Sequence, residues 1–101
     1  MVLYYAERGD SPKTQVITKD ENGNLIVPTG MPVCKILLRD KVIATLVVSN
    51  SAASTYAAFW SVPANAELDT VYVAEWSWVY STRPYIKRDK IYVYQTGVSR
   101  R

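Results

Sequence analysis

Hydrophobic and polar residues alternate along most of the chain with a period of two, as in β-strands, and not with the period of about 3.6 found in helices. The clearest run spans residues 71–80. Its even positions are aromatic or small: Tyr72, Ala74, Trp76, Trp78 and Tyr80. Successive side chains point to opposite faces of a sheet, so this pattern predicts a strand whose aromatic face forms part of the core. The predicted aromatic core residues are Tyr72, Trp76, Trp78 and Tyr80.

The odd positions of the same run carry smaller side chains, among them Val71, Val73, Glu75 and Val79. Apolar side chains that gather on an outer face indicate an interaction surface. The alternative is that other loops of the chain cover this face. Glu75 lies between aromatic residues, and we expect it to face solvent or to pair with a lysine on the next strand. The four residues are the candidates for contact with a partner.

Other segments show the same strand character. An Asn22-Gly23 pair, which is typical of a tight hairpin, separates two of them. We expect one helical turn, at 63–68, after Pro63, and a flexible loop at 49–55. The further strands are expected at 15–18, 25–27, 33–38, 42–48, 57–62 and 91–94, the last with a β-branched face and a tyrosine face.

About seven short strands in 101 residues predict an all-β fold, an immunoglobulin-like antiparallel β-sandwich of about seven strands. A small closed barrel is the main alternative. The length allows one domain with one core, so residues 1–101 are expected to form a single sandwich. Residues 1–8 and 96–101 are expected to be arms that become ordered on assembly.

The composition excludes several classes of protein. The chain has no histidine and one cysteine, so it offers neither the commonest general base nor a zinc cluster of cysteines and histidines. Its four glycines are isolated, which excludes a phosphate-binding loop. We therefore expect no catalytic residue, no metal and no cofactor. No apolar run approaches the roughly 20 residues of a spanning helix, and we expect no membrane association.

Positive charge is concentrated near the end of the chain. Residues 83–101 contain six basic side chains against one acidic, a net charge of +5, whereas residues 1–82 have six basic and eight acidic, a net charge of −2. Such an asymmetry can steer an acidic partner, although a solvated edge is the simpler interpretation. The basic-patch candidates are Lys87, Arg88, Lys90, Arg100 and Arg101.

Two binding functions follow from the aromatic residues. Tyr85, Tyr92 and Tyr94 alternate with the basic residues, as in grooves that bind single-stranded nucleic acid. A small nucleic-acid-binding β-barrel is therefore one alternative. The three tryptophans suggest a carbohydrate-binding module as another, although Trp76 and Trp78 share the predicted core face.

One longer pattern resembles an immunoglobulin-like domain common in tailed phages, found at the N-terminus of baseplate upper proteins and in small head, neck and tail proteins. Gly9-Asp10 precedes a strand, an Asp-x-x-Gly hairpin follows at 20–23, and Thr29-Gly30 leads into the next strand. The segment 70–76, Thr-Val-Tyr-Val-Ala-Glu-Trp, is similar to a Tyr-x-Ala-Glu-Trp strand of that family. The chain departs from the family at Val27-Pro28 and at Asp69, both in turns.

This resemblance implies a non-enzymatic structural component of a tailed-phage virion, made in the host cytoplasm. Capsid decoration, the neck, and a tail or baseplate adaptor are the candidate places. The implied partners are other virion proteins, namely capsid, portal or neck, and tail subunits, in a symmetric multimer.

Overall fold

The computed structural model describes residues 3–94, which form eight β-strands and no helix. The expected helical turn at 63–68 is wrong. The segment is a turn in which the Ala66 N–H donates to the Pro63 carbonyl at 3.1 Å. The strands are β1 (Leu3–Ala6), β2 (Lys13–Ile17), β3 (Val33–Leu38), β4 (Lys41–Leu46), β5 (Val48–Ala52), β6 (Thr55–Phe59), β7 (Thr70–Tyr80) and β8 (Arg83–Val93).

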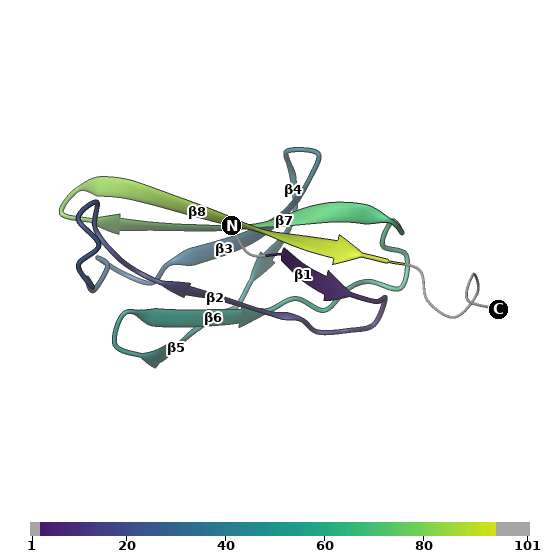
Figure 1. Cartoon of the computed structure of the whole chain (residues 1–101), viewed down its shortest axis with the longest axis horizontal. Coiled ribbons are helices and arrows are strands. Elements are labelled where there is room, and N and C mark those ends of the chain that lie inside the picture. Colours follow the sequence, from purple (N-terminus) through teal and green to yellow (C-terminus); the bar gives the residue numbers. More distant parts are fainter. Residues whose placement is uncertain (1–2, 95–101) are drawn as a thin grey trace.

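The strands form two sheets that pack face to face (Figure 1). The larger sheet has the order β1-β8-β7-β3-β4, and the smaller has the order β2-β6-β5. This division, with the last two strands and the third and fourth in one sheet, is the arrangement of an immunoglobulin-like sandwich. The predicted fold class is confirmed, with eight strands where about seven were expected. Neighbouring strands are antiparallel except β1 and β8, which are parallel.

The N-terminal segment is part of the sandwich. Residues Leu3 to Ala6 pair with Lys90 to Val93 of β8, and Ala6 is fully buried. The prediction that residues 1–8 form an arm is therefore wrong for Leu3 to Ala6. The sequence pattern did not reveal this pairing because the partner strand, β8, lies at the other end of the chain. The second predicted arm, 96–101, lies outside the described residues.

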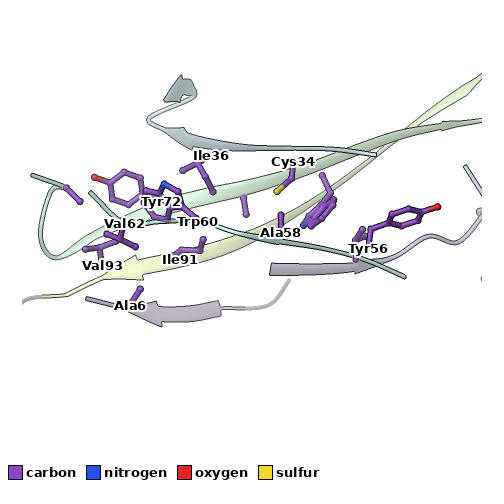
Figure 2. Packing of buried hydrophobic residues seen from close by; sticks show 14 of the residues in the cluster. Ala6, Cys34, Ile36, Tyr56, Ala58, Trp60, Val62, Tyr72, Ile91 and Val93 are labelled. Carbon is purple, nitrogen blue, oxygen red and sulfur yellow. The ribbon is translucent and has the colours of Figure 1, made fainter. Parts of the chain in front are cut away.

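The core lies between the sheets and is built from alternate residues of each strand (Figure 2). Tyr72, Trp76 and Trp78 are buried there, as predicted. Tyr80 is not, since 36% of its surface is exposed. It lies at the tip of the β7–β8 hairpin, which extends beyond the smaller sheet (Figure 1), so no opposing layer covers it.

Several strands differ from the sequence-based expectation. The strand expected at 91–94 begins at Arg83, as β8. Residues 25–27 form only an isolated bridge, Lys19 to Leu25, after the hairpin. The expected continuous strand at 42–48 is divided at Val47, which is 89% exposed, because β4 and β5 belong to different sheets and the chain crosses between them. The expected loop at 49–55 instead contributes most of β5, an exposed edge strand paired with β6.

Candidate interaction surface

The outer face of the five-stranded sheet carries all four residues predicted to contact a partner. Val71 and Val79 are exposed, while Val73 and Glu75 are half-buried between neighbouring side chains. Strand register places further residues on the same face. We call the following set the outer face: Leu3, Tyr5, Val33, Lys35, Leu37, Val71, Val73, Glu75, Ser77, Val79, Ile86, Arg88, Lys90 and Tyr92.

A charged row crosses the middle of the outer face. Glu75 lies opposite Arg88 on β8 and opposite Lys35 on β3. Two nitrogens of Arg88 approach one oxygen of Glu75, at 2.9 Å for Nε and 2.8 Å for Nη2. Glu75 thus pairs with a residue on the next strand, as expected, but this residue is an arginine where a lysine was expected. Because the pair is partly exposed, it contributes little to stability and mainly fixes the position of the two side chains.

An apolar patch lies on one side of the charged row. Val79 and Ile86 are 43% and 57% exposed, and Val33 and Met31 lie beside them. Together with Trp78, Tyr85 and neighbouring residues they line a shallow groove of about 300 Å³. The sequence analysis found Val79 but missed Ile86 and Val33. These residues share a face because of the register between β3, β7 and β8. The sequence of a single strand does not reveal that register.

A cluster of three tyrosines lies on the other side of the charged row. The ring of Tyr5, which is 66% exposed, meets those of Tyr92 and Tyr94 edgewise, with centroids 5.9 and 6.4 Å away. The Tyr92 hydroxyl donates to Asp69 Oδ1 at 3.1 Å, and this bond raises the pKa of Tyr92. The Tyr94 hydroxyl lies 3.2 Å from a carboxylate oxygen of Glu7. The carboxylates therefore hold two half-buried rings, those of Tyr92 and Tyr94, against the exposed ring of Tyr5.

The structure separates the residues of the predicted basic patch. Arg88 and Lys90 lie on the outer face, whereas Lys87 has the opposite orientation, in register with the buried Trp76. Tyr85 shares that inner side and stacks on Trp78, with the rings 5.8 Å apart and nearly parallel at 5°. Alternation along β8 thus divides the expected groove of tyrosines and basic residues between two faces. Arg100 and Arg101 lie outside the described residues.

A buried polar cluster lies on the inner face, and the sequence analysis did not predict it. Asp89 and Thr14 are fully buried, and Trp76 Nε1 donates to Thr14 Oγ1 at 3.0 Å. Burial, and secondarily the charge of Asp89, raises the pKa of the Cys34 thiol to about 12 and also raises the pKa of Tyr4. The thiol is therefore protonated near neutral pH and does not act as a nucleophile there. Asp89 lies two residues before the buried Ile91 and four before the buried Val93, so alternation along β8 places all three on one face. This alternation could have predicted the burial of Asp89.

Metal and membrane features are absent from the described part of the chain. Within residues 3–94, no group of three or more histidine, cysteine, aspartate or glutamate side chains is placed to hold a metal ion. In the same range, no helix has the length and apolar character needed to cross a membrane.

The comparisons with known proteins support the fold alone. No family model matches the chain, and no curated protein matches it. Among the solved structures that match is an endo-fucoidan hydrolase from glycoside hydrolase family 107, with a TM-score of 0.54 and 17% sequence identity. The match covers 97% of this chain but 16% of the hydrolase, so the chain corresponds to a small part of that enzyme's length. The chain is therefore assigned to a class, the immunoglobulin-like β-sandwich.

Proposed function

We propose that the protein is a non-enzymatic structural component of a tailed-phage virion that binds other virion proteins through its outer face. The observation that carries this proposal is the apolar patch of the outer face, where Val79 and Ile86 are 43% and 57% exposed beside a groove of about 300 Å³. Clustered apolar side chains of this kind mark protein-binding surfaces. The resemblance of the hairpin and of strand 70–76 to tailed-phage domains supports the choice of partner.

The composition of the outer face supports a protein partner. Apolar residues lie on both sides of the charged row, so an interface here would bury apolar area around one fixed polar contact. Specific interfaces combine an apolar centre with a few oriented polar groups in this manner. Capsid, portal or neck, and tail subunits are the proposed partners, and a symmetric multimer on the particle is the proposed assembly. A capsid decoration, a neck protein and a tail or baseplate adaptor are the alternatives for its place.

Mass spectrometry of purified particles from lysates of the source tests this proposal. We expect the chain to be present at a copy number that matches a symmetry of the particle. A copy number equal to the number of sites on the capsid shell would indicate capsid decoration. A small copy number, equal to the number of subunits in one ring, would indicate the neck or tail. Absence of the chain from intact particles would contradict the proposal.

A pair of variants tests the surface itself. The double substitution Val79→Glu and Ile86→Glu places two carboxylates in the apolar patch without removing any core contact. We expect a folded protein that no longer co-sediments with particles. Ser49→Glu, on exposed β5 of the opposite sheet, is the control and should co-sediment normally. Equal co-sedimentation of both proteins would exclude the outer face as the contact surface.

A second candidate function is carbohydrate binding, favoured by the tyrosine cluster. Exposed aromatic rings beside carboxylates offer both an apolar surface and hydrogen-bond acceptors to a sugar. The matched hydrolase acts on a polysaccharide according to its name, although the likeness is one of fold. Calorimetric titration with a panel of neutral and sulfated oligosaccharides tests this function. Binding should be lost in Tyr5→Ala and retained in Tyr80→Ala, whose ring lies at the hairpin tip.

Binding of single-stranded nucleic acid has less support, because Lys87 and Tyr85 lie on a different face from Arg88, Lys90 and Tyr92. It would show as an affinity for oligonucleotides that falls steeply with salt.

A further inference from the structure

The flank of the sandwich between β2 and β8 has an open strand edge. β2 is the first strand of the smaller sheet, and its neighbour within that sheet is β6. β1, the strand closest to it in sequence, pairs with β8 of the other sheet instead (Figure 1). Among the described strands, none pairs with the outer edge of β2. A strand edge of this kind offers backbone donors and acceptors to another chain.

The backbone register shows which groups point outward. Even residues of this segment bond to the β6 side: the Trp60 N–H donates to the Pro12 carbonyl at 3.1 Å, and the Thr18 N–H donates to Ser54 at 2.8 Å. Residues alternate in direction along a strand, so the N–H and C=O groups of Lys13, Gln15, Ile17 and Lys19 point away from β6. The Gln15 backbone already has a hydrogen bond with Tyr4. The edge is therefore available mainly on either side of Gln15.

A basic groove lies along this edge. It measures about 480 Å³ and is lined by Tyr4, Gln15, Ile17, Lys19 and Lys87. Among the described residues, β1 covers β8 from Lys90 to Val93, and the groove lies beside the part of β8 that precedes this pairing. Neither lysine of the groove has an ion pair with another described residue.

Acidic side chains also lie near the groove, but none of them is among its lining residues. Asp89 is fully buried on the core side. The Asp20 carboxylate accepts hydrogen bonds from the backbone N–H groups of Asn22 and Asn24 in its own hairpin. The lining thus presents positive charge and one apolar side chain, Ile17, which is 45% exposed.

We propose that the outer edge of β2 binds an extended acidic segment of a partner protein as an additional strand. The outward backbone groups of Ile17 and Lys19 would hydrogen-bond to the segment, as in other cases of strand addition. Carboxylates of the segment lie over Lys19 and Lys87, and an apolar side chain of the segment packs on Ile17. This surface is separate from the outer face, so the proposal does not depend on the function proposed above.

Charge disfavours a second copy of β2 in the antiparallel register centred on Val16. Two antiparallel copies centred on Val16 would place Lys13 directly opposite Lys19 at both ends of the pair. Like charges opposite each other in a sheet are destabilising, and lysines on an edge strand commonly prevent self-association. The same lysines attract a strand that carries glutamate or aspartate at alternate positions.

Fluorescence anisotropy with a labelled peptide tests the proposal. The probe is a short blocked peptide of alternating threonine and glutamate with a central valine. We expect saturable binding that weakens with added salt, and protection of the Ile17 and Lys19 amides from hydrogen exchange in the complex. A peptide with lysine in place of glutamate, and one with a central proline, should not bind.

Variants of the protein locate the binding site. Ile17→Pro removes an outward N–H without removing a bond to β6, and it should abolish binding. The double reversal Lys19→Glu and Lys87→Glu should weaken binding by at least about tenfold, because it turns attraction into repulsion. Lys41→Glu, on exposed β4, reverses one charge elsewhere on the surface and should bind normally.

Several results would overturn the proposal. These are the absence of saturable binding, equal binding of the lysine peptide, an unchanged affinity in the double reversal variant, and protection of β4 or β5 amides in place of those of β2. The protein could also self-associate in a way that Ile17→Pro abolishes. That result would show that the occupant of the β2 edge is a second copy of the chain and not an acidic segment.

Discussion

Both faces of β7 carry apolar side chains, yet only one face belongs to the core. Tyr72, Ala74, Trp76 and Trp78 point inward and are buried, whereas Val71 and Val79 point outward and are each 43% exposed. The smaller sheet covers the inner face, and none of the described elements covers the outer one. Hydrophobic character alone therefore does not show which face is structural. The difference lies in size, because the large aromatic side chains fill the space between the sheets and the smaller valines remain on the surface.

Truncation of one side chain on each face should separate their roles most clearly. We expect Trp76→Ala to reduce the free energy of unfolding by about 3–5 kcal/mol, because it leaves a large cavity in the core. Val71→Ala should change it by less than about 0.5 kcal/mol, since that side chain is exposed. Urea denaturation followed by circular dichroism measures both. Similar losses for the two variants would show that an unseen partner or segment covers the outer face.

A milder change distinguishes the two inner tryptophans. The indole N–H of Trp76 donates to Thr14, while that of Trp78 has no hydrogen-bond partner among the described residues. Trp76→Phe should therefore cost about 1–3 kcal/mol more than Trp78→Phe, because it leaves the buried hydroxyl with one partner fewer. The same denaturation experiment measures the difference. Equal costs would mean that the hydrogen bond to Thr14 contributes nothing net.

Cys34 and Lys35 are neighbours on opposite faces of β3, so thiol chemistry can report on each face. The pKa of the Cys34 thiol is raised from 9.0 to about 12 by burial, then by Asp89. The folded state thus favours the protonated thiol. The resulting stabilisation is complete below about pH 9 and is lost as the pH rises toward 12.

We expect Cys34 to react with a thiol reagent at pH 8 only as fast as the protein opens. The variant Lys35→Cys in a Cys34→Ala background should react at once, because its thiol is on the outer face. Immediate reaction of Cys34 in the folded wild-type protein would contradict its burial.

The smallest effect is expected from the charged row. Breaking the ion pair by Glu75→Gln should cost about 0.2–1 kcal/mol, because Arg88 is largely exposed. A double-mutant cycle with Arg88→Gln should give a coupling energy in the same range, and added salt should reduce it. A much larger coupling would indicate that the outer face is shielded from solvent.

Local periodicity predicted β7 well and the end of β8, of which only 91–94 was expected as a strand. In β7 the aromatic residues are buried as expected up to Trp78, and in β8 Ile91 and Val93 are buried while Tyr92 and Tyr94 face outward. The smaller sheet covers these inner positions, so large apolar side chains are buried there.

Strands at the edges were harder to predict. β5 has the polar sequence Val-Ser-Asn-Ser-Ala, and its backbone bonds to β6 hold it in place with little burial of side chains. β1 is short, and its only neighbour is β8, which lies at the other end of the chain. The groove beside β2 was not predicted for the same reason, since it is lined by residues of three strands that are distant in sequence, β1, β2 and β8. Such features depend on contacts between distant segments, which local patterns do not contain.

The parallel pairing of β1 with β8 has a mechanical consequence. The first and last described strands lie side by side and point the same way, with Leu3 beside Lys90 and Ala6 beside Val93. A force that pulls Leu3 and Val93 apart acts on the two strands in opposite directions along their length. The hydrogen bonds between them then carry the load together in shear, and none can open alone before the others. A subunit stretched through both ends of its chain would therefore resist extension at this pair of strands before any other part of the sandwich is loaded.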